Sequence, residues 1–95
     1  KEVYAFVFPF KEQVYWEQWA HQLEEPGRYE RLKPNRIVGE ALEGQKVAFY
    51  DLTDDLIELG KEEVLYWPID SHWNPAGNRI AAELVHEWLA GHGFP

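Results

Sequence analysis

Two short apolar runs constrain the fold of this chain more than any other feature. Residues 3–8 read Val-Tyr-Ala-Phe-Val-Phe and are followed by Pro9, and residues 46–51 read Lys-Val-Ala-Phe-Tyr-Asp. Continuous apolar runs of this kind are typical of strands that are buried on both faces of a sheet. Because helical patterns separate the two runs, the order of elements predicts an α/β fold with a parallel sheet.

The helical patterns lie between and after these runs. Residues 12–24 carry Tyr15, Trp19 and Leu23 on one helical stripe, and a Glu-Pro-Gly sequence follows it. Three further helices are expected: from Pro34 to Gly44, from the N-cap Thr53 to Gly60, and from the N-cap Asn74 to Gly91. Residues 64–67 are interpreted as a short extended segment. The sequence therefore predicts few strands with helices packed on both of their faces.

The composition limits the classes of function. The net charge of −8 argues against a nucleic-acid partner and against an anionic membrane surface, since clustered Lys and Arg bind both. The chain contains no Cys, which excludes disulfides and thiolate chemistry and leaves the cellular compartment open. No apolar run approaches the roughly 18 residues that span a membrane.

The length and the small number of strands suggest that the chain is part of something larger. Its 95 residues make at most one small domain, and the chain begins at Lys1 and contains no Met. We interpret this as a sign of a longer protein. So few strands rarely complete a parallel sheet with two apolar faces, so we expect a missing neighbour on at least one edge. A second copy of the chain is one candidate for that neighbour.

The stretch from Asp70 to Asn74 holds the candidate catalytic residues. It follows the last extended segment and precedes a helix, and in parallel α/β sheets ligands bind beyond the carboxyl ends of the strands. Lys11 and Asp51, each just after a strand, are expected at the same edge. His72 is suited to act as a general base near neutral pH, and Asp70 can orient its ring and stabilise the imidazolium.

A nucleophile for this pair is missing from the chain. Ser71 is the only Ser, and adjacent side chains in an extended loop point apart, so its hydroxyl cannot easily reach the ring of His72. Thr53 is better explained as a helix cap. The chain thus offers a base and an orienting acid with nothing for them to activate.

The same residues allow other interpretations. Asp70 and His72 can simply satisfy backbone groups near the start of a helix. They are also a weak nucleus for a metal site, which needs about three or four ligands. No metal and no cofactor is expected. Trp67 and Trp73 flank the pair Asp70 and His72 and are candidate substrate-binding residues, because indole rings can stack on sugars.

Residues 70–77, Asp-Ser-His-Trp-Asn-Pro-Ala-Gly, resemble the C-terminal block of the SGNH/GDSL hydrolase family, in the branch where it reads Asp-x-His-Trp-Asn-x-x-Gly. Phe-Pro-Phe-Lys at residues 8–11 and Phe-Tyr-Asp-Leu-Thr at residues 49–53 resemble strand ends of that branch. The resemblance implies a flavodoxin-like three-layer fold and ester hydrolysis or acyl transfer by a Ser-His-Asp triad. Relatives in the branch include polysaccharide O-acetyltransferases, so the implied substrate is an ester or an acylated carbohydrate.

Applied to this chain, the resemblance implies His72 as the triad base and Asp70 as its acid, although many members place the acid one residue earlier. The family's Ser block and oxyanion-hole blocks have no counterpart here. Residues 1–95 are therefore expected to be the C-terminal part of a single SGNH-hydrolase-like domain. Its partner is expected to be the N-terminal remainder, and the chain alone is expected to be inactive. The alternative is a non-catalytic α/β module that binds a protein or carbohydrate and pairs through its open sheet edge.

Overall fold

The fold was analysed in a computed structural model that describes residues 3–20 and 30–93. Its elements, in chain order, are β1 (Tyr4–Val7), α1 (Lys11–Val14), α2 (Trp16–Trp19), α3 (Lys33–Gly44), β2 (Ala48–Asp51), α4 (Thr53–Leu59) and α5 (Pro75–Gly91). Strands and helices alternate as the hydrophobic periodicity indicates.

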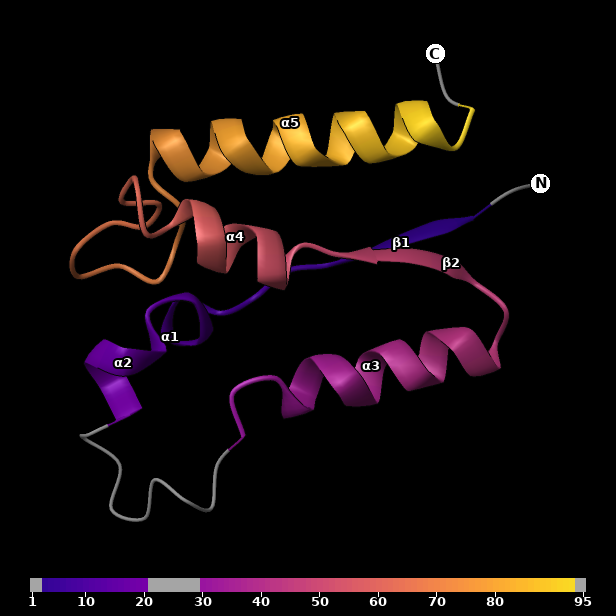
Figure 1. The fold of residues 1–95 in the computed structure, drawn as a ribbon, viewed down its shortest axis with the longest axis horizontal. Helices are drawn as coiled ribbons and strands as arrows, with labels where there is room; N and C mark the ends of the chain where they lie inside the picture. The colour runs from indigo at the N-terminus through magenta and orange to yellow at the C-terminus, as the bar shows by residue number, and fades with distance from the viewer. Residues whose placement is uncertain (1–2, 21–29, 94–95) are drawn as a thin grey trace.

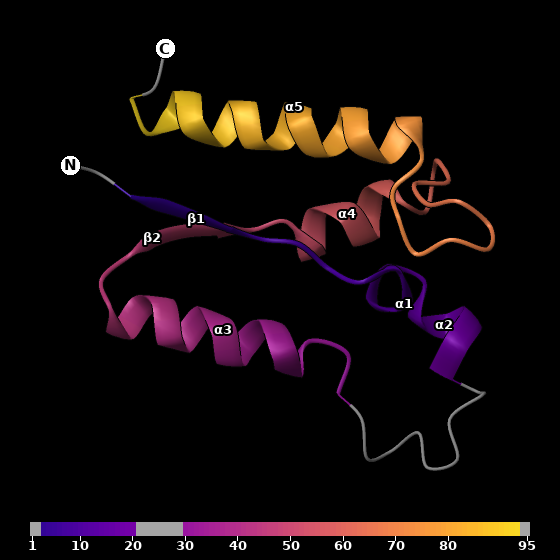
Figure 2. The same ribbon diagram turned by 180° about the vertical axis from the view of Figure 1, so that it is seen from behind.

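The two strands pair in parallel and form the middle of three layers. The register runs from Tyr4 opposite Ala48 to Val7 opposite Asp51, so both strands end at the same edge. Helix α5 covers one face of the sheet and α3 covers the other, as both views of the ribbon show (Figures 1 and 2). This arrangement confirms the prediction of a partial α/β sandwich with a parallel sheet of few strands.

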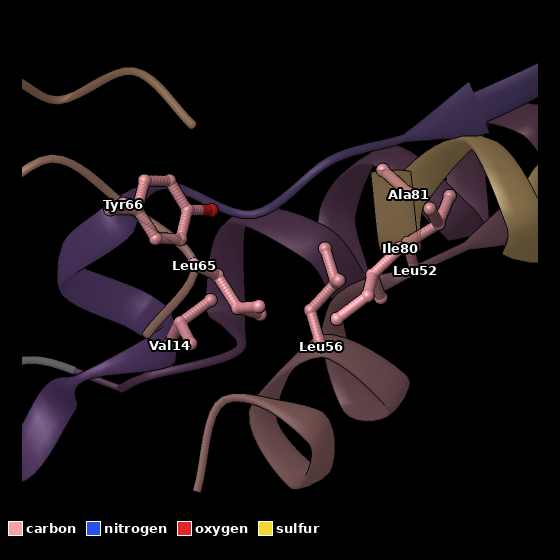
Figure 3. Close-up of a cluster of buried hydrophobic side chains, with 7 residues drawn as sticks. All are labelled: Val14, Leu52, Leu56, Leu65, Tyr66, Ile80 and Ala81. Carbon is pink, nitrogen blue, oxygen red and sulfur yellow. The ribbon is translucent and has the colours of Figure 1, made fainter. Parts of the chain in front are cut away.

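The hydrophobic core lies beyond the carboxyl ends of the strands rather than along them. Leu52, Leu56 and Leu65 have no exposed surface. They form one cluster with four further buried side chains: Val14, Tyr66, Ile80 and Ala81 (Figure 3). Because α1, α4, α5 and the segment before α5 all contribute, this cluster holds together the elements that surround the expected ligand-binding edge.

The single helix expected over residues 12–24 is wrong over its described part. The chain instead forms two short helices that break at Tyr15, whose φ and ψ are −109° and 45°. Arg31 supplies the physical reason. Its Nε donates to the carbonyl of Gln13 at 2.6 Å and its Nη2 to that of Val14 at 2.9 Å. A distant side chain thus takes over carbonyls that a continuous helix would use, and Leu23 lies outside the described residues.

Thr53 is not the N-cap that the sequence suggested. It is the first residue of α4, and Leu52 occupies the N-cap position. The carboxylate of Asp51 does the capping, because it accepts a hydrogen bond from the backbone N–H of Thr53 at 3.0 Å. The extended segment expected at residues 64–67 is also wrong as a strand, since it contributes one isolated antiparallel bridge, between Tyr66 and Trp73.

Some apolar surface stays uncovered beside the sheet. Ile37 and Val38 lie on the helical face that the pattern of α3 marks as apolar, yet they are 54% and 43% exposed. Phe8 and Phe10, just after β1, are also exposed.

Within the described residues, no helix is both long enough and apolar enough to cross a bilayer.

Candidate active site

The candidate site is the loop of residues 67–72, which is closed at its base by backbone hydrogen bonds. The N–H of Trp67 donates to the carbonyl of His72 at 3.2 Å, and the N–H of Asn74 donates to that of Leu65 at 2.9 Å. The Asn74 amide also donates to the carbonyl of Val64 at 2.8 Å. Both ends of the loop are therefore fixed while every residue from Trp67 to His72 is exposed.

Helix α5 begins directly after the loop, with the N-cap that the sequence predicts. The Asn74 side chain accepts a hydrogen bond from the N–H of Gly77 at 2.8 Å, and Pro75 occupies the first helical turn. Gly77 allows the helix to approach the preceding segment, because a Cβ there would lie 2.1 Å from the carbonyl oxygen of Leu65. The helix start thus places the loop at a defined position on the core.

Asp70 and His72 face each other within this loop. One carboxylate oxygen of Asp70 accepts the backbone N–H of His72 at 2.8 Å and also contacts Nδ1 of the His72 ring. The His72 side chain is 84% exposed, so its other ring nitrogen, Nε2, can be reached from outside. The spacing of two residues therefore lets one carboxylate bind both the backbone and the ring of the histidine.

These hydrogen bonds also set the charge state of the carboxylate. They keep the pKa of Asp70 below its usual value of 3.8, with the backbone N–H of His72 as the largest cause, then its ring, and the charge of Lys11 as a smaller one. Asp70 is consequently ionised at neutral pH. An ionised carboxylate on Nδ1 favours the tautomer in which Nε2 is free to accept a proton.

Lys11 and Asp51 both lie at the carboxyl edge of the sheet, as expected from their positions after the two strands. The Lys11 ammonium donates to the carbonyls of Trp67 at 2.7 Å and of Pro68 at 3.0 Å. Asp51 lies instead in a buried network, where its carboxylate accepts from the Thr53 hydroxyl at 2.6 Å. The edge therefore brings Lys11 to the loop but leaves Asp51 to support the fold.

Two residues that no sequence pattern singles out, Gln13 and Asn35, complete the Asp51 network. The Asn35 amide donates to the Thr53 hydroxyl at 2.8 Å and accepts a hydrogen bond from the Gln13 side chain. Both side chains are buried, and they connect α3 to α1. Isolated Asn and Gln residues carry no pattern that reveals such a contact, so only the three-dimensional arrangement identifies them.

Trp67 and Trp73 lie on different sides of the loop. Trp67 is 48% exposed and lines a hollow of about 330 Å³ together with Lys11 and Tyr15. Trp73 is half-buried, and its ring contacts Phe8 edge-on at a centroid distance of 5.2 Å. Trp67 is thus available to a ligand, whereas Trp73 packs mainly against the protein.

Neither the Ser71 hydroxyl nor the Thr53 hydroxyl completes a nucleophilic site. Ser71 is exposed, and in the described part of the chain its hydroxyl makes no hydrogen bond to His72. The Thr53 hydroxyl is 1% exposed and is held by Asp51 and Asn35. Among the described residues there is also no group of three His, Asp or Glu side chains arranged to hold a metal ion.

A parallel α/β sheet with a carboxylate–imidazole pair at its carboxyl edge is an arrangement found in hydrolase-like domains. The comparison with protein families identifies which one. The family model described as "SGNH hydrolase-like domain, acetyltransferase AlgX" matches residues 1–94, and the chain belongs to this family. The resemblance carried by residues 70–77 is thereby confirmed. No curated protein and no solved structure matches the chain.

Proposed function

We propose that this chain supplies the base and the orienting acid of an SGNH-type esterase or acyltransferase. The observation that carries the proposal is the contact between Asp70 and Nδ1 of His72 in an exposed loop at the carboxyl edge of the sheet. A histidine that served only the fold would have no need to leave Nε2 in solvent. The family description, which names an acetyltransferase, supports the same class of chemistry.

In the proposed reaction, Nε2 of His72 takes the proton of a serine hydroxyl as its oxygen attacks the ester carbonyl carbon. Asp70 stabilises the imidazolium that results. His72 then returns the proton to the leaving alcohol, and an acyl-serine remains. Attack by water on that intermediate gives hydrolysis, and attack by a second hydroxyl gives acyl transfer. In both cases His72 removes the proton of the attacking group and returns it to the serine oxygen as the acyl–serine bond breaks.

The serine of this triad is proposed to lie outside residues 1–95. The only Ser of the chain is Ser71, and its hydroxyl does not contact His72. Triads are assembled by proximity in space, and unrelated hydrolases contain the three residues in different chain orders. The serine can therefore precede or follow this segment. The hydrogen-bond donors that stabilise the oxyanion are proposed to lie outside residues 1–95 as well.

An acylated carbohydrate is the proposed substrate class. The exposed ring of Trp67 stands beside the hollow at the loop, and indole faces stack on sugar rings. Trp73 is proposed to act at shorter range, by holding the backbone that follows His72 against Phe8. Replacing Trp67 with Ala should raise KM for a sugar ester more than for a small acetate ester.

We further propose that the remainder of the domain covers the edge of β1 that faces away from β2, where no other described strand pairs. Phe8 lies between two grooves on opposite faces of the sheet. One, of about 440 Å³, runs along α5, and the other, of about 250 Å³, runs along α3. An added parallel strand with helices on both sides would fill both grooves at once. If so, Phe8→Asp should destabilise the complete protein without changing its association state; dissociation of an oligomer would point to a second copy instead.

The test of the catalytic proposal is ester hydrolysis by the complete protein with His72→Ala. Loss of a triad base lowers turnover by roughly three or more orders of magnitude. His92→Ala is the matched control, because His92 is exposed after α5 and its ring contacts Trp88 and not the loop. Equal turnover in wild type and His72→Ala would exclude the base role and favour a non-catalytic module.

The 95 residues by themselves are proposed to be inactive. They bring a base without a nucleophile, so purified residues 1–95 should hydrolyse no acetate ester above the rate of free imidazole. Turnover that depends on His72 in that preparation would show that a nucleophile lies within the chain.

A further inference from the structure

Lys11 at the edge of the candidate site holds its ammonium group against the backbone of the catalytic loop. The Nζ atom lies 2.7 Å from the carbonyl oxygen of Trp67, 3.0 Å from that of Pro68 and 3.4 Å from that of Asp70. An ammonium group has three N–H donors, so these three acceptors match its full capacity. A lysine beside an active site would ordinarily be taken for a binder of anionic substrate, and this one has no donor left for that role.

The two partners of this contact differ in how firmly they are held. Lys11 begins α1, whose Gln13 and Val14 are buried, and the Gln13 side chain accepts the N–H of Phe10 at 2.8 Å. The loop on the other side is exposed throughout. Lys11 thus connects an element packed in the core to a segment that has little packing of its own.

The contact also reaches the residue that orients the base. Lys11 binds the main-chain carbonyl of Asp70, while the side chain of Asp70 binds the N–H and Nδ1 of His72. Within the described residues, no other side chain donates a hydrogen bond to the carbonyls of Trp67, Pro68 or Asp70. The position of the carboxylate relative to the core therefore depends on Lys11.

We propose that Lys11 is a positioning residue, which fixes the Asp70–His72 pair by binding the carbonyls of the loop and whose ammonium group does not bind the substrate. The inference rests on the proposed function of that pair. Because the Lys11 ammonium binds backbone carbonyls of the loop, loss of this side chain should slow the chemical step and leave substrate binding unchanged.

The kinetic test uses the complete protein with Lys11→Met, which keeps the length of the side chain and removes its charge and donors. Misplacement of a catalytic group by about 1 Å lowers kcat about 100-fold, so we expect a 10- to 100-fold loss of kcat with KM within about twofold. Lys61→Met is the matched control, because Lys61 forms an exposed pair with Glu58 and lies away from the loop. A rise in KM with normal kcat would overturn the proposal and make Lys11 a substrate-binding residue.

Two further arms separate this inference from the function on which it rests. In a protein that already carries Asp70→Ala, adding Lys11→Met should lower kcat by a clearly smaller factor than it does in wild type, since the part that acts through the carboxylate is already lost. A multiplicative loss would overturn the positioning role. If His72→Ala retains turnover, the proposed function fails; if His72→Ala is inactive and Lys11→Met keeps full kcat, only the inference about Lys11 fails.

A measurement on the wild-type protein keeps the proposal testable even if Lys11→Met does not fold. Acetic anhydride acylates only an amine that is released from its hydrogen bonds and deprotonated. Lys11 should therefore be acylated at least about fivefold more slowly than Lys61, as followed by peptide mass spectrometry. Loss of turnover should track modification of Lys11. Equal rates at the two lysines would overturn the proposal.

Discussion

Leu65 and Ile69 belong to the same short segment, yet Leu65 is fully buried and Ile69 is fully exposed. The first packs in the cluster of Leu52 and Leu56, and the second lies in the loop that carries Asp70 and His72. The base of the segment thus contributes to the stability of the fold, and its tip carries the candidate chemistry. Substitutions at the base should reduce stability, and substitutions at the tip should reduce activity.

The largest expected effect is at Gly77, where α5 packs against the base of the segment. In Gly77→Ala the new Cβ would lie 2.1 Å from the carbonyl oxygen of Leu65, so the backbone of α5 or of the segment around Leu65 must move. We expect a loss of about 3 kcal/mol or more in the free energy of unfolding, measured by denaturant titration. Gly44→Ala is the control, because nothing lies within 4 Å of its Cβ position at the end of α3. A loss of equal size in Gly44→Ala would contradict the steric explanation.

The next largest effect is expected in the core cluster against which Leu65 packs. Leu56→Ala removes a side chain without exposed surface and should lower the free energy of unfolding by about 2–5 kcal/mol. Ile37→Ala is the comparison, since Ile37 is 54% exposed on α3 and its truncation should change stability by about 1 kcal/mol or less. A large effect at Ile37 in the complete protein would indicate that another part of the domain covers α3.

The elements that the sequence predicted well are those whose signals are local. Asn74 and Pro75 mark the start of α5, and the two apolar runs mark the strands, because caps and buried strands depend on neighbouring residues. The position of Lys11 at the carboxyl edge followed from the rule that parallel strands end together. The same rule was applied to His72 through a strand at residues 64–67 that the sheet does not contain. Local patterns were thus sufficient for the layers and for the place of Lys11.

The features that the sequence could not predict depend on contacts between distant residues. Arg31 breaks the expected helix by binding the carbonyls of Gln13 and Val14 from outside it. Asp51 replaces Thr53 as the cap because the network around Asn35 already uses the Thr53 hydroxyl. Periodicity within a window contains no information about such partners, so these residues become visible only in the folded chain.

A smaller effect is expected in the buried polar network of Gln13, Asn35 and Thr53. Asn35→Ala leaves the buried Gln13 amide and Thr53 hydroxyl without one partner each. Unsatisfied buried polar groups cost about 1–3 kcal/mol, so the midpoint temperature of thermal unfolding should fall. The control change Gln45→Ala affects an exposed amide just after α3 and should be close to neutral. A neutral Asn35→Ala would mean that water or another group replaces the amide.

The smallest effect concerns the stability contributed by the exposed tip, and its dependence on pH has a definite sign. The folded-state pKa of Asp70 lies below 3.8, so the folded state favours the carboxylate more than the unfolded chain does. The stability that this provides is fully present above pH 3.8 and is lost as the pH falls through the folded-state pKa. Asp70→Asn should therefore melt slightly below wild type at neutral pH, and the difference should shrink in acid.

The measurement compares the melting temperatures of wild type and Asp70→Asn down to the lowest pH at which both unfold cooperatively. Carboxylates elsewhere titrate in both proteins, so the difference isolates Asp70 and the groups around it, His72 and Lys11. Because the side chains of the pair are exposed, solvent screens the interaction and the shift should be much smaller than that of Leu56→Ala. A difference that stays constant with pH would mean that the Asp70 carboxylate contributes by its shape and not by its charge. The loop would then be stabilised by packing, as the segment around Leu65 is. The ionised carboxylate beside His72 would then matter for the reaction and not for the stability of the fold.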